Sequence, residues 1–261
     1  MLNAINSLIR HVKRFCELLI VARSSKHEES GAEGRGVSRL VPTQKRSRER
    51  FERILSCAIE VMADKGSEDF RMSDIVERTG IAFGSLYQYF PDKSAIIGTL
   101  AERYNAIGRD CVRKELTGLR DIADLHDTLW RMTKAYYQFF IDEPAVHDVW
   151  QATQVDRALQ ELDKEDGVFL TRLLFDAVRP VAPSVPQQSL ADFCQVVMVL
   201  VAAAVRHAIT LPPKEGRRLL SVFRELLPHN LDAAVRPVAT EGRAGAGRRL
   251  NSARRAPKNP I

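Results

Sequence analysis

Apolar residues recur along most of this chain every three or four positions, which is the spacing of one face of an α-helix. No alternating apolar and polar run is long enough to predict a strand, so the pattern indicates an all-α protein. One clear stripe follows Pro42 and is closed by Gly66, a residue typical of the position just after a helix. It consists of Phe51, Ile54, Leu55, Ala58, Val61 and Met62.

Further stripes place the remaining helices. Two short ones are predicted at about 72–78 and 83–89, and Pro91 ends the second because proline disfavours helix at the residue before it. A longer helix is predicted from Asp92 or Lys93 to about Gly108. Longer amphipathic patterns then predict five helices, at about 125–141, 144–162, 166–179, 189–210 and 214–227.

Shifts in composition divide the chain into four parts. Residues 1–42 are an extension with a polar, Gly-rich linker, 43–108 and 109–235 are helical domains, and 236–261 is an Arg-rich tail expected to be disordered. The first 22 residues, apolar and basic, are either a surface-binding amphipathic helix or a dispensable extension. The net charge of +6 is weak evidence for DNA binding, because residues 42–108 hold as many acidic as basic groups.

Several classes of protein find little support. The longest apolar run covers residues 196–205, whereas a membrane helix needs about 20 residues, so a buried helix is predicted and no membrane span. No nucleophile, base and orienting group stand together, which argues against an enzyme, and no metal or other cofactor is predicted. The cysteines are too far apart for a zinc site or a disulfide framework and indicate reduced thiols in the cytoplasm. They are Cys16, Cys57, Cys111 and Cys194.

The most informative segment covers residues 72–93 and reads MSDIVERTGIAFGSLYQYFPDK. Two short helical patterns meet at Gly80, where a positive φ angle costs little, so the two helices can cross at a steep angle. This is the form of a helix-turn-helix, here at about 71–90, whose second helix lies in the major groove of DNA. The segment therefore predicts a DNA-binding domain within residues 43–108.

The second helix carries side chains suited to DNA. Gly84 and Ser85 are small enough to let the helix start approach the DNA backbone, and Gln88 can both donate and accept at an adenine edge. The groups predicted to bind phosphate oxygens are Tyr87, Tyr89 and Lys93. Basic residues near the start of the preceding helix either form a solvated face or contact phosphates, namely Lys45, Arg46, Arg48 and Arg50.

These residues together resemble the DNA-binding domain of the tetracycline-repressor (TetR/AcrR) family of bacterial transcriptional regulators. The similar stretch covers residues 48–108 and matches at Arg53-Ile54-Leu55, Gly66, Asp74-Ile75-Val76, Gly80-Ile81, Gly84-Ser85-Leu86-Tyr87-Gln88-Tyr89-Phe90 and Lys93. The resemblance implies that Tyr87 and Lys93 hold the DNA backbone. It also implies that four residues face the bases, namely Ala82, Phe83, Ser85 and Gln88.

Two positions depart from the family pattern. Arg71 stands where a helix-capping Thr or Ser is common, so the first helix of the motif either starts elsewhere or is capped in another way. Ala82 replaces a Ser or Thr at the start of the second helix and removes a hydroxyl. Phe83 is bulky where a base contact is expected, and an aromatic ring suits a thymine methyl group.

The resemblance also implies the architecture of the second domain. Its middle helices should enclose a small-molecule pocket, and its last two long helices should pair across the twofold axis of a homodimer. Residues 196–205 are then either part of that dimer face or an ordinary buried helix. Aromatic residues at helical spacing are usually core, but some residues here are candidates for an effector pocket. They are Trp130, Tyr137, Trp150, His147 and Arg206.

The sequence therefore predicts a cytoplasmic, homodimeric transcriptional regulator. It is expected to be a ligand-responsive repressor that binds a palindromic double-stranded operator and a small-molecule effector. The alternative is a helical small-molecule-binding or interaction protein that has lost sequence-specific DNA binding, for which Arg71 and Ala82 are the best arguments.

Overall fold

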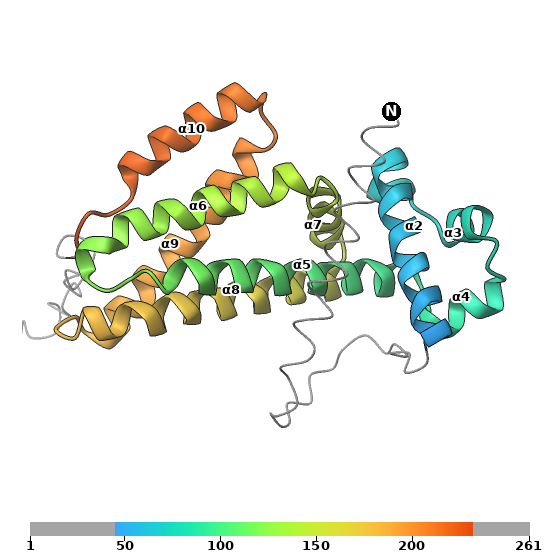
Figure 1. Cartoon of the computed structure of the whole chain (residues 1–261), viewed down its shortest axis with the longest axis horizontal. Coiled ribbons are helices and arrows are strands. Elements are labelled where there is room, and N and C mark those ends of the chain that lie inside the picture. The colour runs from blue at the N-terminus through green and yellow to red at the C-terminus, as the bar shows by residue number, and fades with distance from the viewer. Residues whose placement is uncertain (1–44, 232–261) are drawn as a thin grey trace, which may run out of the picture. The chain divides into compact units, whose positions relative to one another are not determined.

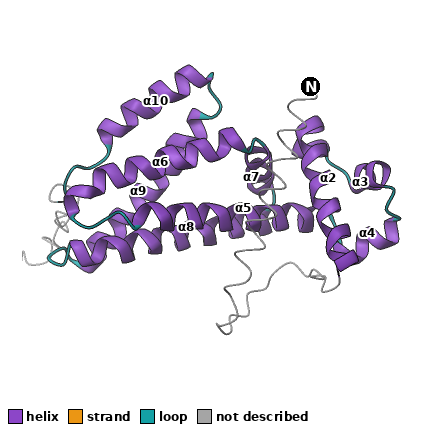
Figure 2. Cartoon of the chain, in the orientation of Figure 1, coloured by secondary structure: helices purple, strands orange, loops and turns teal. Residues whose placement is uncertain are grey.

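The computed structural model describes residues 45–231, and every regular element in that range is a helix (Figures 1 and 2). The predictions for residues 1–42 and 236–261 lie outside the described residues. In chain order the elements are α2 (Lys45–Asp69), α3 (Met72–Thr79), α4 (Phe83–Tyr89), α5 (Lys93–Leu116), η1 (Ile122–Asp124), α6 (Leu125–Asp142), α7 (Ala145–Val155), α8 (Arg157–Val178), η2 (Arg179–Val181), α9 (Gln187–Ala208) and α10 (Pro213–Leu226).

The first three helices pack as the apolar stripes predict. All six members of the α2 stripe are buried, and Gly66 leaves the helical conformation at φ 81°, where a residue without a Cβ is favoured. Leu86 in α4 and Phe90 just after it are fully buried. The Phe90 ring stacks on Phe51 of α2 with ring centroids 4.9 Å apart. These contacts hold α4 against α2.

Helix α5 is longer than predicted. The predicted end at Gly108 is wrong, because the helix continues to Leu116 and crosses the boundary expected between the domains. A glycine inside a helix costs only about 1 kcal/mol, which packing readily offsets. Here the helix packs on α2 at one end and on α6, α7 and α8 along its length. One continuous helix therefore runs across the boundary expected from the sequence (Figure 1).

The break between α7 and α8 also differs from the prediction. The expected helices at 144–162 and 166–179 are wrong, since α7 ends at Val155 and α8 runs unbroken from Arg157 to Val178. Asp156 separates them by accepting the N–H of Ala158 at 2.9 Å, and its other oxygen accepts the hydroxyl of Ser94 at 2.7 Å. Helices α6, α9 and α10 lie within two residues of their predicted bounds.

Two buried apolar clusters form the core. The first joins α2, α3, α4 and α5 to α6 and α7, and extends to Leu159, Val205 and Leu220. The second lies among α6, α8 and α9 and includes Leu129, Leu174 and Val197. The helix-turn-helix thus shares its apolar core with the helices that follow it.

Helix α9 is the most apolar helix in the chain's described part. By length and composition it is the single helix between residues 45 and 231 that could cross a membrane, a test that core helices of soluble proteins also pass. It buries Leu190, Cys194 and Val201 against neighbouring helices. The membrane test is therefore weak evidence here.

Candidate nucleic-acid interface and effector cavity

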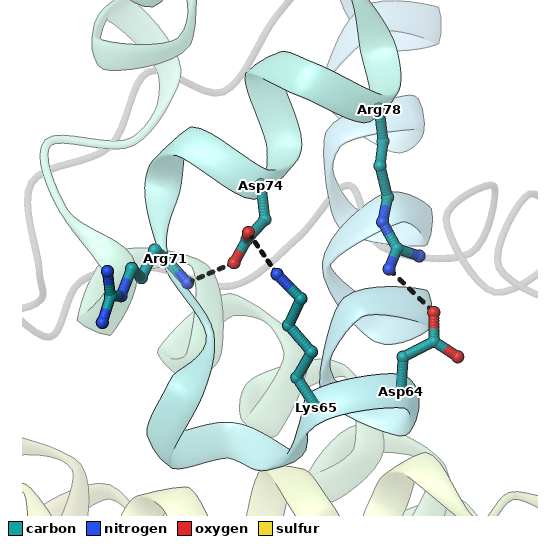
Figure 3. A network of polar contacts seen from close by, with 5 residues as sticks. All are labelled: Asp64, Lys65, Arg71, Asp74 and Arg78. Atoms are coloured by element: carbon teal, nitrogen blue, oxygen red, sulfur yellow. Dashed lines mark hydrogen bonds and ion pairs between the residues drawn. The ribbon is translucent and has the colours of Figure 1, made fainter.

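The start of α3 is held by an aspartate three residues into the helix, not by the residue that precedes it. Arg71 has extended backbone, and its side chain offers no oxygen for capping. Instead, a carboxylate oxygen of Asp74 accepts the backbone N–H of Arg71 at 2.9 Å, and the other accepts Lys65 Nζ at 2.7 Å (Figure 3). The helix starts at Met72 as predicted, and the missing Thr or Ser is replaced by this arrangement.

The Asp74 carboxylate is buried, yet it stays ionised readily. The hydrogen bond from Lys65 lowers the pKa of Asp74 below its ordinary value, with the Arg71 N–H adding to the effect and burial opposing it. A second ion pair, between Arg78 and Asp64 at 2.7 Å, also joins α3 to α2 but lies at the surface (Figure 3). Two polar links therefore fix the helix that supports α4.

The turn between α3 and α4 is closed by Gly80. Its φ angle of 67° is left-handed, as the sequence predicts, and its N–H donates to the carbonyl of Val76 at 2.9 Å. Ala82 precedes α4 with extended backbone and has no side chain that could cap the helix. The first turn of α4 therefore keeps its N–H groups free of any side-chain cap.

Helix α4 presents one face to solvent while the other is anchored in the core. Gly84 and Gln88 are exposed, Ser85 is half-buried, and the rings of Phe83 and Tyr87 are 47% and 48% exposed. These two rings stack with centroids 6.2 Å apart, which forms an aromatic patch on the exposed face. Contiguous exposed apolar patches often mark a binding surface.

Tyr89 lies differently from the other predicted DNA-contacting residues. It is half-buried, its hydroxyl hydrogen-bonds with Ser47 at 2.8 Å, and its ring meets the edge of Phe51. The residue thus joins α4 to the start of α2. Lys93 is exposed and its Nζ reaches the carbonyl of Glu68 at 3.4 Å.

The basic residues at the start of α2 lie beside α4, because Ser47 is among them (Figure 1). All four are exposed to solvent: Lys45, Arg46, Arg48 and Arg50. Their ammonium and guanidinium groups extend the exposed face of α4 with positive charge, which suits a polyanion. The Tyr89–Ser47 hydrogen bond thus joins the basic start of α2 to α4, whereas Lys93 contacts Glu68 near the other end of α2.

A cavity of about 900 Å³ lies among α5, α6, α7, α8 and α9. Of the sequence-predicted ligand residues, Trp150 and Arg206 line it. Trp130 packs instead between the two core clusters, and Tyr137 is buried with its hydroxyl close to Gly216 of α10. His147 does not line the cavity, and its ring centroid lies 6.1 Å from that of Trp150.

Some residues that shape these sites were missed at the level of sequence. Asp74 had a signal, since an acidic residue three positions after the expected cap is the second half of a capping box. Asp163 binds Arg206 at 3.1 Å in the cavity wall. No signal in the sequence links these two residues, because they lie on different helices 43 positions apart. Sequence spacing reports neighbours within a helix and not across two helices.

The fold and these two sites define a class of protein. An exposed, anchored second helix of a helix-turn-helix stands at one end, and a helical domain with a cavity follows it. These features are typical of a DNA-binding helix-turn-helix protein that also has a ligand-sized cavity.

Comparison with known proteins agrees with this class. Residues 54–100 match the family model described as "Bacterial regulatory proteins, tetR family", and residues 123–235 match "Tetracyclin repressor-like, C-terminal domain". The two matches together cover more than half of the chain. The protein belongs to the TetR family of bacterial regulators.

Two curated relatives match over part of the chain. The HTH-type transcriptional regulator YvdT of Bacillus subtilis is 38% identical over 80 residues, which is 31% of this chain and 41% of that protein. The HTH-type transcriptional repressor KstR of Mycolicibacterium smegmatis is 33% identical over 72 residues, 27% of this chain and 35% of that one. The chain spans less than half the length of these relatives.

Solved structures extend the similarity to the whole fold. A TetR-family regulator from Syntrophomonas wolfei has a TM-score of 0.54 at 15% identity, covering 74% of this chain and 98% of that one. The protein in a SmeT–triclosan complex has a TM-score of 0.53 at 16% identity, covering 73% and 96%. At this identity the likeness concerns the fold alone.

Proposed function

We propose that this protein is a cytoplasmic, ligand-responsive transcriptional repressor that binds a palindromic operator as a homodimer. The observation that carries the proposal is the exposed face of α4, where Phe83, Tyr87 and Gln88 stand in solvent while Leu86 is fully buried. A helix held in this way can enter a major groove without rearranging its own domain. The repressor named among its relatives supports the sign of regulation.

A homodimer is supported by an apolar surface on the last two helices. Val196, Val199 and Leu200 of α9 are 50–61% exposed, and Val222 and Leu226 of α10 are 61% and 75% exposed. Exposed apolar residues gathered on adjoining helices are typical of an interface. We propose that two copies pair through this α9–α10 face, so that two α4 helices reach successive major grooves.

Helix α5 offers a physical route between the cavity and α4. Its first residue, Lys93, follows α4 closely, and its middle part lines the cavity with Tyr104 and Ile107. We propose that an effector binds better to a form in which α5 is displaced and the two α4 helices no longer match the operator. The effector must bind that form more tightly than the DNA-bound form, or it shifts nothing.

The test is a titration of the purified protein against genomic fragments, followed by the selected operator and a scrambled duplex. The operator should bind at least about a thousandfold more tightly than the scrambled DNA at physiological salt. Equal affinity for both duplexes at every salt concentration would refute the proposal. It would favour instead a ligand-binding protein that no longer reads DNA.

Two substitutions separate base contacts from phosphate contacts. Gln88→Ala should cost about 1–3 kcal/mol at one operator position and little elsewhere. Lys93→Ala should weaken binding to all sequences and lower the salt slope of log K by about one. A Gln88→Ala variant with an unchanged preference at every position, or a Lys93→Ala variant with an unchanged slope, would remove that residue from its role.

A further inference from the structure

The cavity has an apolar body and one polar end. Its apolar walls come from five helices and include Ile107, Met132, Phe139, Val149, Leu170 and Val201. Arg206 contacts three other lining residues, namely Asp163, Trp150 and Tyr136, and this group of four is called the polar end. A volume of about 900 Å³ falls within the range of small-molecule sites, which is about 300–1,000 Å³.

Two hydrogen-bond donors at the polar end are buried and unused. Among residues 45–231, neither Trp150 Nε1 nor Arg206 Nε has a hydrogen-bond partner. The Arg206 guanidinium stacks on the Trp150 ring, 4.5 Å from its centroid, so the two donors belong to one compact group. A buried polar group without a partner costs about 1–3 kcal/mol, and an acceptor atom that reached these nitrogens through a small shift of the two side chains would recover that cost.

The charges around these donors are already balanced. Arg206 binds Asp163 at 3.1 Å, and Asp166, also in the wall, is bound by Arg109. Of the other charged lining residues of the described chain, Lys164 pairs with Glu161 at 3.0 Å and Asp142 accepts from Gln138 at 2.7 Å, and both are exposed to solvent. An anion at the polar end would meet no uncompensated positive charge, and a cation there would face two unused donors.

We propose that the effector is an uncharged, largely apolar molecule whose hydrogen-bond acceptor, such as a carbonyl oxygen, is bound by Trp150 Nε1 and Arg206 Nε. This inference rests on the proposed function, in which the cavity is the effector site. The apolar part of the molecule would contact the aliphatic and aromatic walls of the cavity. Its acceptor atom would receive hydrogen bonds from the two donors.

The test compares three probes of equal chain length at pH 7.5: a twelve-carbon methyl ketone, the matching carboxylate and the matching primary amine. Binding to the full chain is measured by isothermal titration calorimetry, in the absence of DNA. The ketone should bind at least about tenfold more tightly than either charged probe, a factor that corresponds to about 1.4 kcal/mol. In Trp130→Phe, which leaves Trp150 as the sole tryptophan, the ketone should change the indole emission.

Two variants test the donors directly. Trp150→Phe keeps an aromatic ring and removes the N–H, and Arg206→Lys keeps the charge that faces Asp163 and removes Nε. Each should weaken the ketone by about fivefold to tenfold. Trp130→Phe, whose tryptophan lies outside the cavity, should leave the ketone affinity unchanged and serves as the matched control.

Several results would overturn the assignment. They are a carboxylate or amine that binds as tightly as the ketone, a ketone that does not bind up to its solubility limit, and donor variants that bind it as tightly as Trp130→Phe does. The outcome is independent of the operator titration, which uses ligand-free protein. If the protein binds the ketone but does not select an operator, this inference stands and the proposed function is refuted. If it selects an operator but does not bind the ketone, the proposed function stands and this inference is refuted.

Discussion

Removing the charge of Asp74 should destabilise the protein in a pH-dependent way. Asp74→Asn keeps the shape of the side chain but replaces one of its two oxygens with a donor, so it cannot accept from both Arg71 N–H and Lys65 Nζ. Loss of a helix cap typically costs about 1 kcal/mol. The ion pair adds about 1 kcal/mol or less, because the Lys65 side chain is 47% exposed and solvent screens it. We expect a loss of about 1–2 kcal/mol in the free energy of unfolding at pH 7.

The pH dependence has a definite sign. The folded-state pKa of Asp74 lies below its ordinary value of 3.8, so the ionised side chain stabilises the folded protein fully well above pH 3.8. That stabilisation is lost as the pH falls through the lower folded-state pKa. The stability gap between wild type and Asp74→Asn should therefore be constant from pH 8 to pH 6 and shrink below about pH 5.

Urea unfolding followed by circular dichroism measures this gap, and the chain offers a matched control. Asp64→Asn also removes a carboxylate that joins α2 to α3, but Asp64 is 61% exposed and caps no helix. It should cost less than about 0.5 kcal/mol. The reasoning is refuted by an Asp74→Asn variant as stable as wild type at pH 7, or by an equal loss in Asp64→Asn.

Three further predictions follow from packing, exposure and burial. A Cβ on Gly216 would lie 2.4 Å from the carbonyl oxygen of Ala208, so Gly216→Ala should lower the free energy of unfolding by about 1–3 kcal/mol. Gly167→Ala, in open space, should raise it by up to about 1 kcal/mol, and thermal unfolding that shows the same sign for both variants would contradict this. Leu200→Asp on the α9–α10 face should give a monomer, as measured by light scattering, whereas Val155→Asp, at a site on α7 that is 76% exposed, should remain a dimer. A Leu200→Asp variant that stays dimeric would show that the proposed dimer face is wrong. Burial raises the pKa of Cys194 to about 12, so a thiol reagent at pH 8 should label it only after unfolding, and peptide mapping that finds it labelled in the folded protein would disprove its burial.

The DNA-binding motif was predictable because its information is local. The bounds of α3 and α4 follow from Gly80, Pro91 and apolar residues three or four positions apart, all within one short segment. Leu86 and Phe90 belong to the same short segment, and both are buried. Helices whose ends carry proline or whose stripes are strong, such as α6, α9 and α10, were placed within two residues.

The two wrong boundaries show where local information ended. Gly108 reads as a helix end, but packing on both sides of α5 offsets its low helix propensity. The break at Asp156 depends on its two carboxylate oxygens, of which one caps α8 and the other binds Ser94, a partner 62 positions earlier in the chain. No local pattern reports a bond of that kind.

The sequence by itself determined the all-helical class and the helix-turn-helix with its turn at Gly80, because each depends on periodicity and turn chemistry within a few residues. Only the tertiary structure decided how the cavity is lined, that Trp150 and Arg206 present unused donors there, and that Trp130 and Tyr137 pack elsewhere. The physical reason is that a cavity wall is assembled from five helices. Which face of each helix meets the others is set by packing across the whole domain.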